Sequence, residues 1–104
     1  MITEIVYIDL PVGTTRADAL AMYRKTAVDR WVSNPDLIEK YYFFDEKTHT
    51  GGGVYVWPTP EAARRWHGDD YVAMVKATYG SPPRIQILDA LIRVVPARSE
   101  ITEL

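Results

Sequence analysis

Four segments of this sequence are predicted to be β-strands, and their apolar residues fall on both faces of each strand. They are residues 2–10, 37–44, 54–57 and 84–95. In the third segment, Val-Tyr-Val-Trp, two valines share one face and two aromatic rings share the other. Because successive side chains of a strand point to opposite sides, a sheet of these strands has two apolar faces. Both faces must therefore be covered.

The first of two predicted helices extends from Thr15 to Trp31. Thr15 and Asp18 have the spacing of a capping box, in which the two residues satisfy each other's free backbone N–H groups. The pair Asn34-Pro35 ends the helical segment, since the residue before a proline avoids the helical region.

The second predicted helix runs from Pro60 to about Tyr79. Thr59 is placed to act as its N-cap, with the proline at the first helical position. Gly80 is the residue that ends it, as glycine commonly does. Gly68 lies in the middle of this helix.

The predicted elements follow one another in the order β-α-β-β-α-β. This is the ferredoxin-like, split-βαβ arrangement, an α+β fold with a four-stranded antiparallel sheet. The 104 residues suit one domain, residues 1–104. After the last strand we expect residues 97–104 to form a polar tail.

Two helices are too few to cover both faces of this sheet. Four strands at a spacing of ~4.8 Å are about 19 Å wide, and two helices of about 10 Å each cover one face of that width. The second face exceeds the apolar patch that soluble monomers tolerate. We therefore predict a homodimer in which sheet packs on sheet about a two-fold axis. The alternative is a monomer whose second sheet face is aromatic and partly exposed to solvent.

The composition excludes several classes of protein. Twelve Lys and Arg against fourteen Asp and Glu give a net charge of -2, whereas nucleic-acid-binding proteins usually carry a basic excess. The absence of Cys excludes disulfides, thiolate nucleophiles and Cys-based metal sites. No apolar run is long enough to cross a bilayer, and the first residues lack the basic start of a signal peptide. We expect a cytoplasmic protein with neither nucleic acid nor membrane as a partner.

No sequence motif for a metal, a cofactor or a nucleophile is present. The chain has no G-x-S-x-G, HExxH, P-loop or dinucleotide fingerprint. His49 and His67 are far apart and the carboxylates are scattered, which is not ligand spacing. The run Gly51–Gly53 opens a strand rather than a helix, so it predicts a hairpin turn or bulge, not a phosphate loop. We expect no cofactor and no metal.

His67 is the candidate catalytic residue. If the second helix continues past Gly68, Asp70 and Tyr71 fall on the same face as His67, at i+3 and i+4. An acid there would orient the imidazole, and a poised histidine is a useful base near neutral pH. The alternative is a half-buried helix histidine, with Asp69 recapping the helix after Gly68.

The chain is rich in aromatic residues, with seven Tyr, three Trp and two Phe. Large aromatic side chains dominate cores and interfaces, which is one interpretation of this excess. The other is a binding site for a flat aromatic ligand, because such sites are apolar with a few polar groups. Four residues are the candidates for such a site: Tyr55, Trp57, Trp66 and Tyr71.

The sequence resembles the YdhR-type monooxygenases over residues 34–63. The resemblance lies in the Asn34-Pro35 turn, an aromatic strand with Lys40, the segment Glu-Lys-Thr-His-Thr-Gly-Gly-Gly-Val-Tyr-Val-Trp at 46–57, and Glu-Ala-Ala at 61–63. These proteins belong to the dimeric α/β-barrel superfamily, with the antibiotic-biosynthesis monooxygenases as relatives. The resemblance implies a homodimer, paired into a dimeric α/β barrel, with a cavity in each subunit between helices and sheet.

In relatives with activity, phenols or quinols are oxidised by O2 without metal or flavin. Deprotonation gives an electron-rich anion that passes an electron to O2, so the protein need only bind, deprotonate and exclude water. Catalytic residues are not shared across this superfamily, so none is carried over by the resemblance. Tyr55 and Trp57 match the family segment only as cavity or packing positions.

The leading hypothesis is a cofactor-independent monooxygenase-like oxidoreductase that acts on a small aromatic phenol or quinol. His67 would be its base or proton shuttle, and the four aromatic residues named above would shape the pocket. A second hypothesis is a non-catalytic dimer that binds a small molecule or serves in stress response. A haem-binding or haem-degrading relative and a polyketide-cyclase-like relative are further alternatives.

Overall fold

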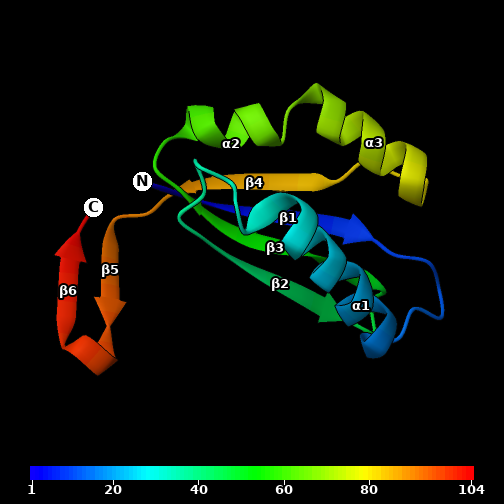
Figure 1. Cartoon of the computed structure of the whole chain (residues 1–104), viewed down its shortest axis with the longest axis horizontal. Coiled ribbons are helices and arrows are strands. Elements are labelled where there is room, and N and C mark those ends of the chain that lie inside the picture. The colour runs from blue at the N-terminus through cyan, green and yellow to red at the C-terminus, as the bar shows by residue number, and fades with distance from the viewer.

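The computed structural model describes residues 1–104 and contains the predicted β-α-β-β-α-β order, with additional breaks (Figure 1). Its main helices are α1 (Arg16–Thr26), α2 (Pro60–Trp66) and α3 (Asp69–Tyr79). Two short helical turns, one π and one 3-10, are η1 (Ala27–Trp31) and η2 (Pro96–Arg98). The strands are β1 (Ile2–Asp9), β2 (Glu39–Asp45), β3 (Thr50–Trp57), β4 (Arg84–Asp89), β5 (Ile92–Val95) and β6 (Glu100–Glu103).

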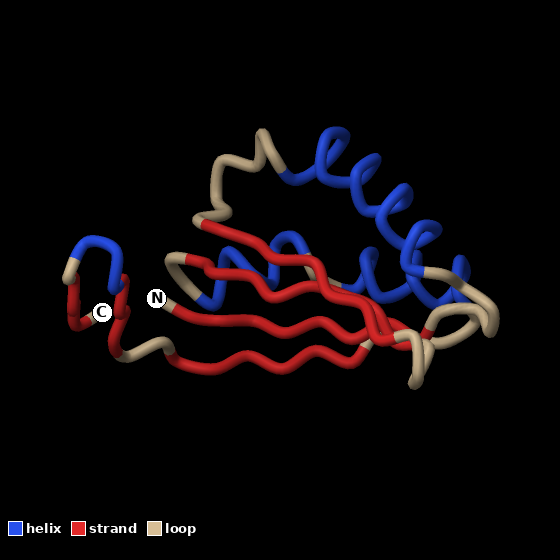
Figure 2. Tube along the Cα trace, turned by 90° about the horizontal axis from the view of Figure 1, so that it is seen from below, coloured by secondary structure: helices blue, strands red, loops and turns tan.

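The main sheet has the strand order β2-β3-β1-β4, and all three of its pairings are antiparallel. This is the topology of the ferredoxin-like fold, so the predicted fold class is confirmed. All the main helices lie on one side of the sheet, and its other side carries no helix (Figure 2). No helix is long and apolar enough to span a bilayer.

The helical face of the sheet holds the buried core. Along β1 the residues at even positions face the helices, and Ile2 and Val6 are buried there. They pack with Tyr55 and Trp57 of β3, and with Trp31 from η1. The remaining members come from the second helical segment: Ala62, Ala63, Tyr71 and Val75. The aromatic excess of the sequence is therefore partly core, as one of the two interpretations requires.

The first helix begins as predicted. Thr15 Oγ1 accepts a hydrogen bond from the Asp18 backbone N–H at 3.1 Å, and the Asp18 carboxylate accepts one from the Thr15 N–H at 3.1 Å. These are the two hydrogen bonds of a capping box. The helix passes into the π-helical turn η1 for its last residues, and this wider turn ends on the buried ring of Trp31.

The second helix is not continuous, which corrects the prediction of one helix from Pro60 to Tyr79. It breaks at His67, and Gly68 becomes the N-cap of α3. A Cβ on Gly68 would lie 2.9 Å from the Arg64 carbonyl oxygen, so a larger side chain at this junction would force the backbone to shift. Asp69 and Asp70 then favour a new helix N-terminus through its dipole. The alternative interpretation, a half-buried His67 with Asp69 recapping the helix, is right about the break only, because the N-cap is Gly68 and the His67 side chain is fully buried.

The fourth strand is also shorter than predicted. It ends at Asp89, which pairs with Ile2, because β1 offers no partner beyond that point. The chain then leaves the sheet, and β5 pairs with β6 in a separate antiparallel hairpin. The predicted polar tail over residues 97–104 is therefore wrong, since residues 100–103 form a strand.

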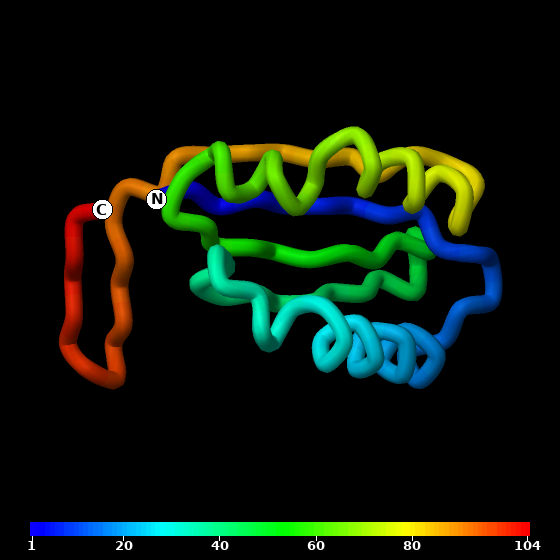
Figure 3. The backbone as a smooth tube through the Cα atoms, turned by 45° about the horizontal axis from the view of Figure 1, so that its top comes forward, coloured from blue at the N-terminus to red at the C-terminus, as the bar shows by residue number.

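The β5-β6 hairpin projects away from the rest of the domain (Figures 1 and 3). The radius of gyration is 14.7 Å, whereas about 13 Å is typical of a compact domain of this length. Leu91 and Ile101 are 70% and 77% exposed, so the apolar side chains of this segment lack cover within the chain. A free two-stranded hairpin is only marginally stable in water.

The glycine run lies inside β3 rather than before it, which corrects the predicted start of the third strand at Val54. Gly51, Gly52 and Gly53 pair with both β1 and β2. Gly52 has φ of +145°, and a Cβ there would overlap the Val6 carbonyl group. A Cβ on Gly53 would lie 3.0 Å from Cε of Lys40, so this glycine leaves room for the lysine side chain.

Replacing Gly52 by alanine is expected to lower the free energy of unfolding by about 3 kcal/mol, through backbone strain and overlap. Gly13 is a matched control, because its φ is +93° but a Cβ added there would have no atom within 4 Å. Gly13→Ala should cost about 1 kcal/mol, from the backbone conformation alone. Urea unfolding of both variants measures the difference, and equal losses would contradict a steric role for Gly52.

Candidate functional site

A hollow, here called the inner cavity, lies between α1, α3 and the helical face of the sheet. Its volume is about 150 Å³ and most of its lining is hydrophobic. The polar and aromatic groups on its wall include Arg30, Trp31, Lys40, Tyr42, Tyr55 and Tyr71. Lys40 of β2 is paired directly with Tyr55 of β3, and both side chains point to the helices.

Lys40 carries an ammonium group into an aromatic cage. Its Nζ lies 4.3 Å from the ring centroid of Trp31, 3.7 Å from that of Tyr42 and 4.4 Å from that of Tyr55. Lys40 forms no ion pair. Burial lowers the pKa of Lys40 from 10.5 to about 7, with the Arg30 charge adding to this and Glu4 opposing it. Near neutral pH, Lys40 therefore exchanges between amine and ammonium.

Arg30 is the second cation of the inner cavity. Its guanidinium carbon lies 4.9 Å from the Trp31 ring centroid and 5.4 Å from that of Tyr71. Nη2 donates a hydrogen bond to the Trp66 carbonyl oxygen at 3.2 Å. Arg30 and Tyr71 also line an outer depression at the α2–α3 junction. These two residues therefore stand at the boundary between the inner cavity and the protein surface.

Tyr55 and Tyr71 supply hydroxyl groups to the same wall. Burial raises the pKa of both phenols, that of Tyr71 to about 12 with the Arg30 charge opposing the rise. Both groups therefore stay protonated at neutral pH, where they donate hydrogen bonds and do not act as bases.

A buried polar cluster lies behind these two tyrosines. The Glu4 carboxylate, 1% exposed, accepts a hydrogen bond from Trp57 Nε1 at 2.9 Å, and the same oxygen lies 2.6 Å from His67 Nδ1. A carboxylate only accepts, so Nδ1 carries the hydrogen and Nε2 is the position left without a partner. The His67 ring packs against Tyr55 and Tyr71, with centroids 4.5 Å and 4.4 Å apart.

The structure brings only some of the predicted site residues together. Tyr55 and Tyr71 line the inner cavity, while His67 and Trp57 are packed behind its wall. Trp66 lines the outer depression, where its Nε1 donates to an Asp36 carboxylate oxygen at 2.9 Å.

Three functional candidates were not identified from the sequence: Glu4, Arg30 and Lys40. Glu4 lies between Ile2 and Val6 on the buried face of its strand, and Lys40 shares its face with Tyr42. Both are charged residues at strand positions whose neighbours on the same face are apolar or aromatic, and this pattern in the sequence could have identified them. The acid expected beside His67 was Asp70, but Asp70 is exposed and the acid is Glu4.

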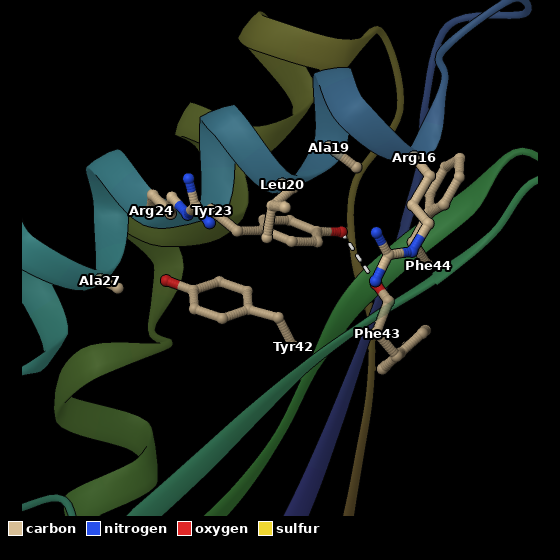
Figure 4. Close-up of a pocket in the computed structure, with 9 residues that line it drawn as sticks. All are labelled: Arg16, Ala19, Leu20, Tyr23, Arg24, Ala27, Tyr42, Phe43 and Phe44. Carbon is tan, nitrogen blue, oxygen red and sulfur yellow. Dashed lines mark hydrogen bonds between the residues drawn. The ribbon is translucent and has the colours of Figure 1, made fainter.

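A surface groove of about 310 Å³ runs between α1 and β2 (Figure 4). Tyr23 and Tyr42 stack with centroids 4.4 Å apart and line both this groove and the inner cavity. The Tyr23 hydroxyl already donates to the Phe43 carbonyl at 2.9 Å and accepts from the Gly52 N–H at 3.0 Å. The groove is larger than the inner cavity, but its cations, Arg16 and Arg24, are exposed to solvent. The inner cavity is therefore the better candidate site.

The side chains offer no place for a metal ion, since no group of three or more His, Cys, Asp and Glu lies together. His67 is also not placed to ligate haem iron. Its side chain is fully buried, and it lines neither the inner cavity nor the outer depression. The inner cavity, at about 150 Å³, is the size of one benzene ring rather than a porphyrin.

No protein-family model matches this chain, and no curated protein is detectably similar to it. Among solved structures, it is similar to an antibiotic biosynthesis monooxygenase, at 19% identity and a TM-score of 0.61, over 88% of this chain and 99% of the other. It is also similar to a protein of unknown function from Nitrosomonas europaea, at 18% identity and a TM-score of 0.65, over 91% and 93%. The narrower resemblance to YdhR-type proteins stays a prediction. At these identities the comparisons establish that this chain has the fold of an antibiotic biosynthesis monooxygenase.

Proposed function

We propose that this protein is a cofactor-independent monooxygenase-like enzyme that oxidises a small phenol or quinol with O2 in the inner cavity. The observation that carries the proposal is the Lys40 amine, held against three aromatic faces in a largely apolar hollow. A cavity of about 150 Å³ suits a single aromatic ring, since an engineered cavity of this size binds benzene. The similarity to an antibiotic biosynthesis monooxygenase supports the same class of reaction.

In the proposed reaction Lys40 touches the substrate. Its neutral amine accepts the proton of the phenol, and the ammonium that forms pairs with the phenolate. The phenolate passes one electron to O2, and the phenoxyl radical and superoxide combine to form a carbon–oxygen bond. Reprotonation and loss of water then leave a quinone, so that one phenol and one O2 give one quinone and one H2O. The surrounding rings exclude bulk water from these steps.

His67, the base expected from the sequence, has a supporting place in this proposal. It holds Glu4 on one side and packs against Tyr55 and Tyr71 on the other. We therefore assign His67 and Glu4 as positioning residues, which fix the two phenol donors on the cavity wall. Trp57 and Trp66 support the wall from outside it.

The proposal includes a homodimer. The face of the main sheet away from the helices, here called the open face, carries Ile5, Tyr7, Tyr41, Phe43, Val54, Val56 and Leu88. Tyr41 is 62% exposed, and nothing in the chain covers this face. The face measures roughly 400 Å², the size of the largest apolar patches on monomers, which are often functional surfaces. A second copy of the chain would cover it, and the projecting β5-β6 hairpin would add contact area at its edge.

Turnover of a panel of single-ring phenols and quinols, with and without O2, tests this function. We expect an O2-dependent quinone product, and a loss of kcat/KM of about 10²–10⁴-fold in Lys40→Met, the usual contribution of a general base. Lys25→Met is the matched control, because Lys25 is an exposed lysine that pairs only with Asp29. The wild-type kcat/KM should fall as pH drops through about 7, since protonation removes the base. Binding without O2-dependent product would instead indicate a non-catalytic binding protein.

A further inference from the structure

The inner cavity is lined by positively charged side chains and by no negatively charged one. Arg30 and Lys40 both line it, and no Asp or Glu does. The nearest buried acid, Glu4, is turned away to hydrogen bond with Trp57 and His67. A phenolate would balance one of the two cations and leave the other without a counter-ion. Arg30 is half-buried and shares the outer depression with Asp69 and Asp70, but it forms an ion pair with neither, so it stays available to a second anionic group on the ligand.

The two cations are placed to bind the two ends of one small molecule. Both lie against the same indole, with Lys40 Nζ 4.3 Å and the Arg30 guanidinium carbon 4.9 Å from the Trp31 ring centroid. Three rings pack around Lys40 Nζ, whereas Arg30 stands at the boundary with the outer depression. The ligand therefore meets Lys40 at its inner end and Arg30 at its outer end.

We infer that the ligand of the inner cavity is a single-ring hydroxylated aromatic acid, with its ring hydroxyl at Lys40 and its carboxylate at Arg30. The planar guanidinium suits the outer end, because its N–H groups match the two oxygens of a carboxylate. A single amine suits the inner end, where one oxygen must gain and lose a proton. This inference rests on the proposed function and adds the substrate class to it.

Calorimetric binding of matched acids and amides tests the inference. The probes are 3- and 4-hydroxybenzoate and the neutral 3- and 4-hydroxybenzamides, which differ from the acids mainly in charge. We expect at least one of the two acids to bind about 10-fold or more tightly than its amide, as a charge-assisted pair requires. Arg30→Gln should remove this preference and leave the amide affinity within about twofold, whereas Arg30→Lys should restore part of it.

The matched control is Arg64→Gln, which removes an exposed cation of α2 that pairs with Glu61. It should leave the preference for the acid unchanged. The inference is overturned if both amides bind as tightly as their acids, if Arg30→Gln keeps the preference, or if neither acid binds at millimolar concentration. If an Arg30 variant fails to fold, the comparison of acid and amide affinities in the wild type still tests the inferred ligand class.

Measurement of O2 uptake separates this inference from the proposed function. If the acids bind with the expected preference but the enzyme takes up no O2 with them, the proposed oxygenase function is wrong and the inferred ligand class is retained. If the enzyme oxidises neutral quinols but does not bind the acids, the proposed function is retained and the inferred ligand class is wrong.

Discussion

Glu4→Ala is expected to lower the free energy of unfolding by about 3–5 kcal/mol, because it removes the acceptor from two buried donors. The carboxylate lies at 1% exposure and is the partner of both Trp57 Nε1 and His67 Nδ1. Without it, an indole N–H and an imidazole N–H stay buried and unpaired, and a cavity forms beneath the sheet. Urea unfolding, followed by tryptophan fluorescence, measures the loss.

Two further substitutions make this expectation specific. Glu4→Gln keeps an oxygen acceptor of the same shape, so it should cost less, about 1–2 kcal/mol. Glu46→Ala is the matched control, because Glu46 is an exposed carboxylate in the turn between β2 and β3, away from both the cluster and the open face. It should change stability by less than about 0.5 kcal/mol. A Glu4→Ala protein within about 1 kcal/mol of the wild type would show that the cluster is not a structural centre.

The fold was predictable where its determinants are local. Thr15 and Asp18 are three residues apart, and the capping box that they form depends on nothing else in the chain. The β-branched and aromatic residues of segments 2–10 and 37–44 likewise favour strands on their own, and β1 and β2 lie there. The order of the elements then allows few topologies, and the observed strand order is that of the predicted ferredoxin-like fold.

The predicted element boundaries are wrong where contacts with residues distant in the sequence determine them. The fourth strand ends at Asp89 because β1 begins at Ile2, and residues 84–95 alone do not reveal that limit. Residues 100–103 became a strand by pairing with residues 92–95, although their composition is polar. The break at Gly68 depends on the close approach of the Arg64 carbonyl, which a helical pattern cannot show.

The candidate site was only half predictable for the same reason. Tyr55 and Tyr71 were identified because aromatic residues are conspicuous in a sequence. Lys40 and Arg30 come from a strand and a π-helical turn, and only the folded chain places both against Trp31. His67 was expected to meet an acid three residues away, and its partner is instead 63 residues away in β1.

Val54→Arg is expected to convert the proposed dimer into a monomer. Val54 is at the centre of the open face, where it is paired with Ile5 on one side and Tyr41 on the other. In a two-fold sheet-on-sheet interface the substitution buries two unpaired guanidinium groups, one from each copy, and each costs several kcal/mol. The dissociation constant should rise by about 10⁴-fold or more, which corresponds to about 5.5 kcal/mol. The monomer should stay folded, since its arginine would then lie in water.

Sedimentation velocity at micromolar concentration distinguishes the outcomes. The wild type should sediment as a particle of twice 11.9 kDa, and Val54→Arg as one of 11.9 kDa. Val28→Arg is the matched control, because Val28 is 71% exposed on η1, on the helical side of the sheet. It makes the same chemical change outside the proposed interface, so it should leave the dimer intact. A wild type that sediments as a single chain would mean that water covers the open face, and the two-copy assembly would have to be abandoned.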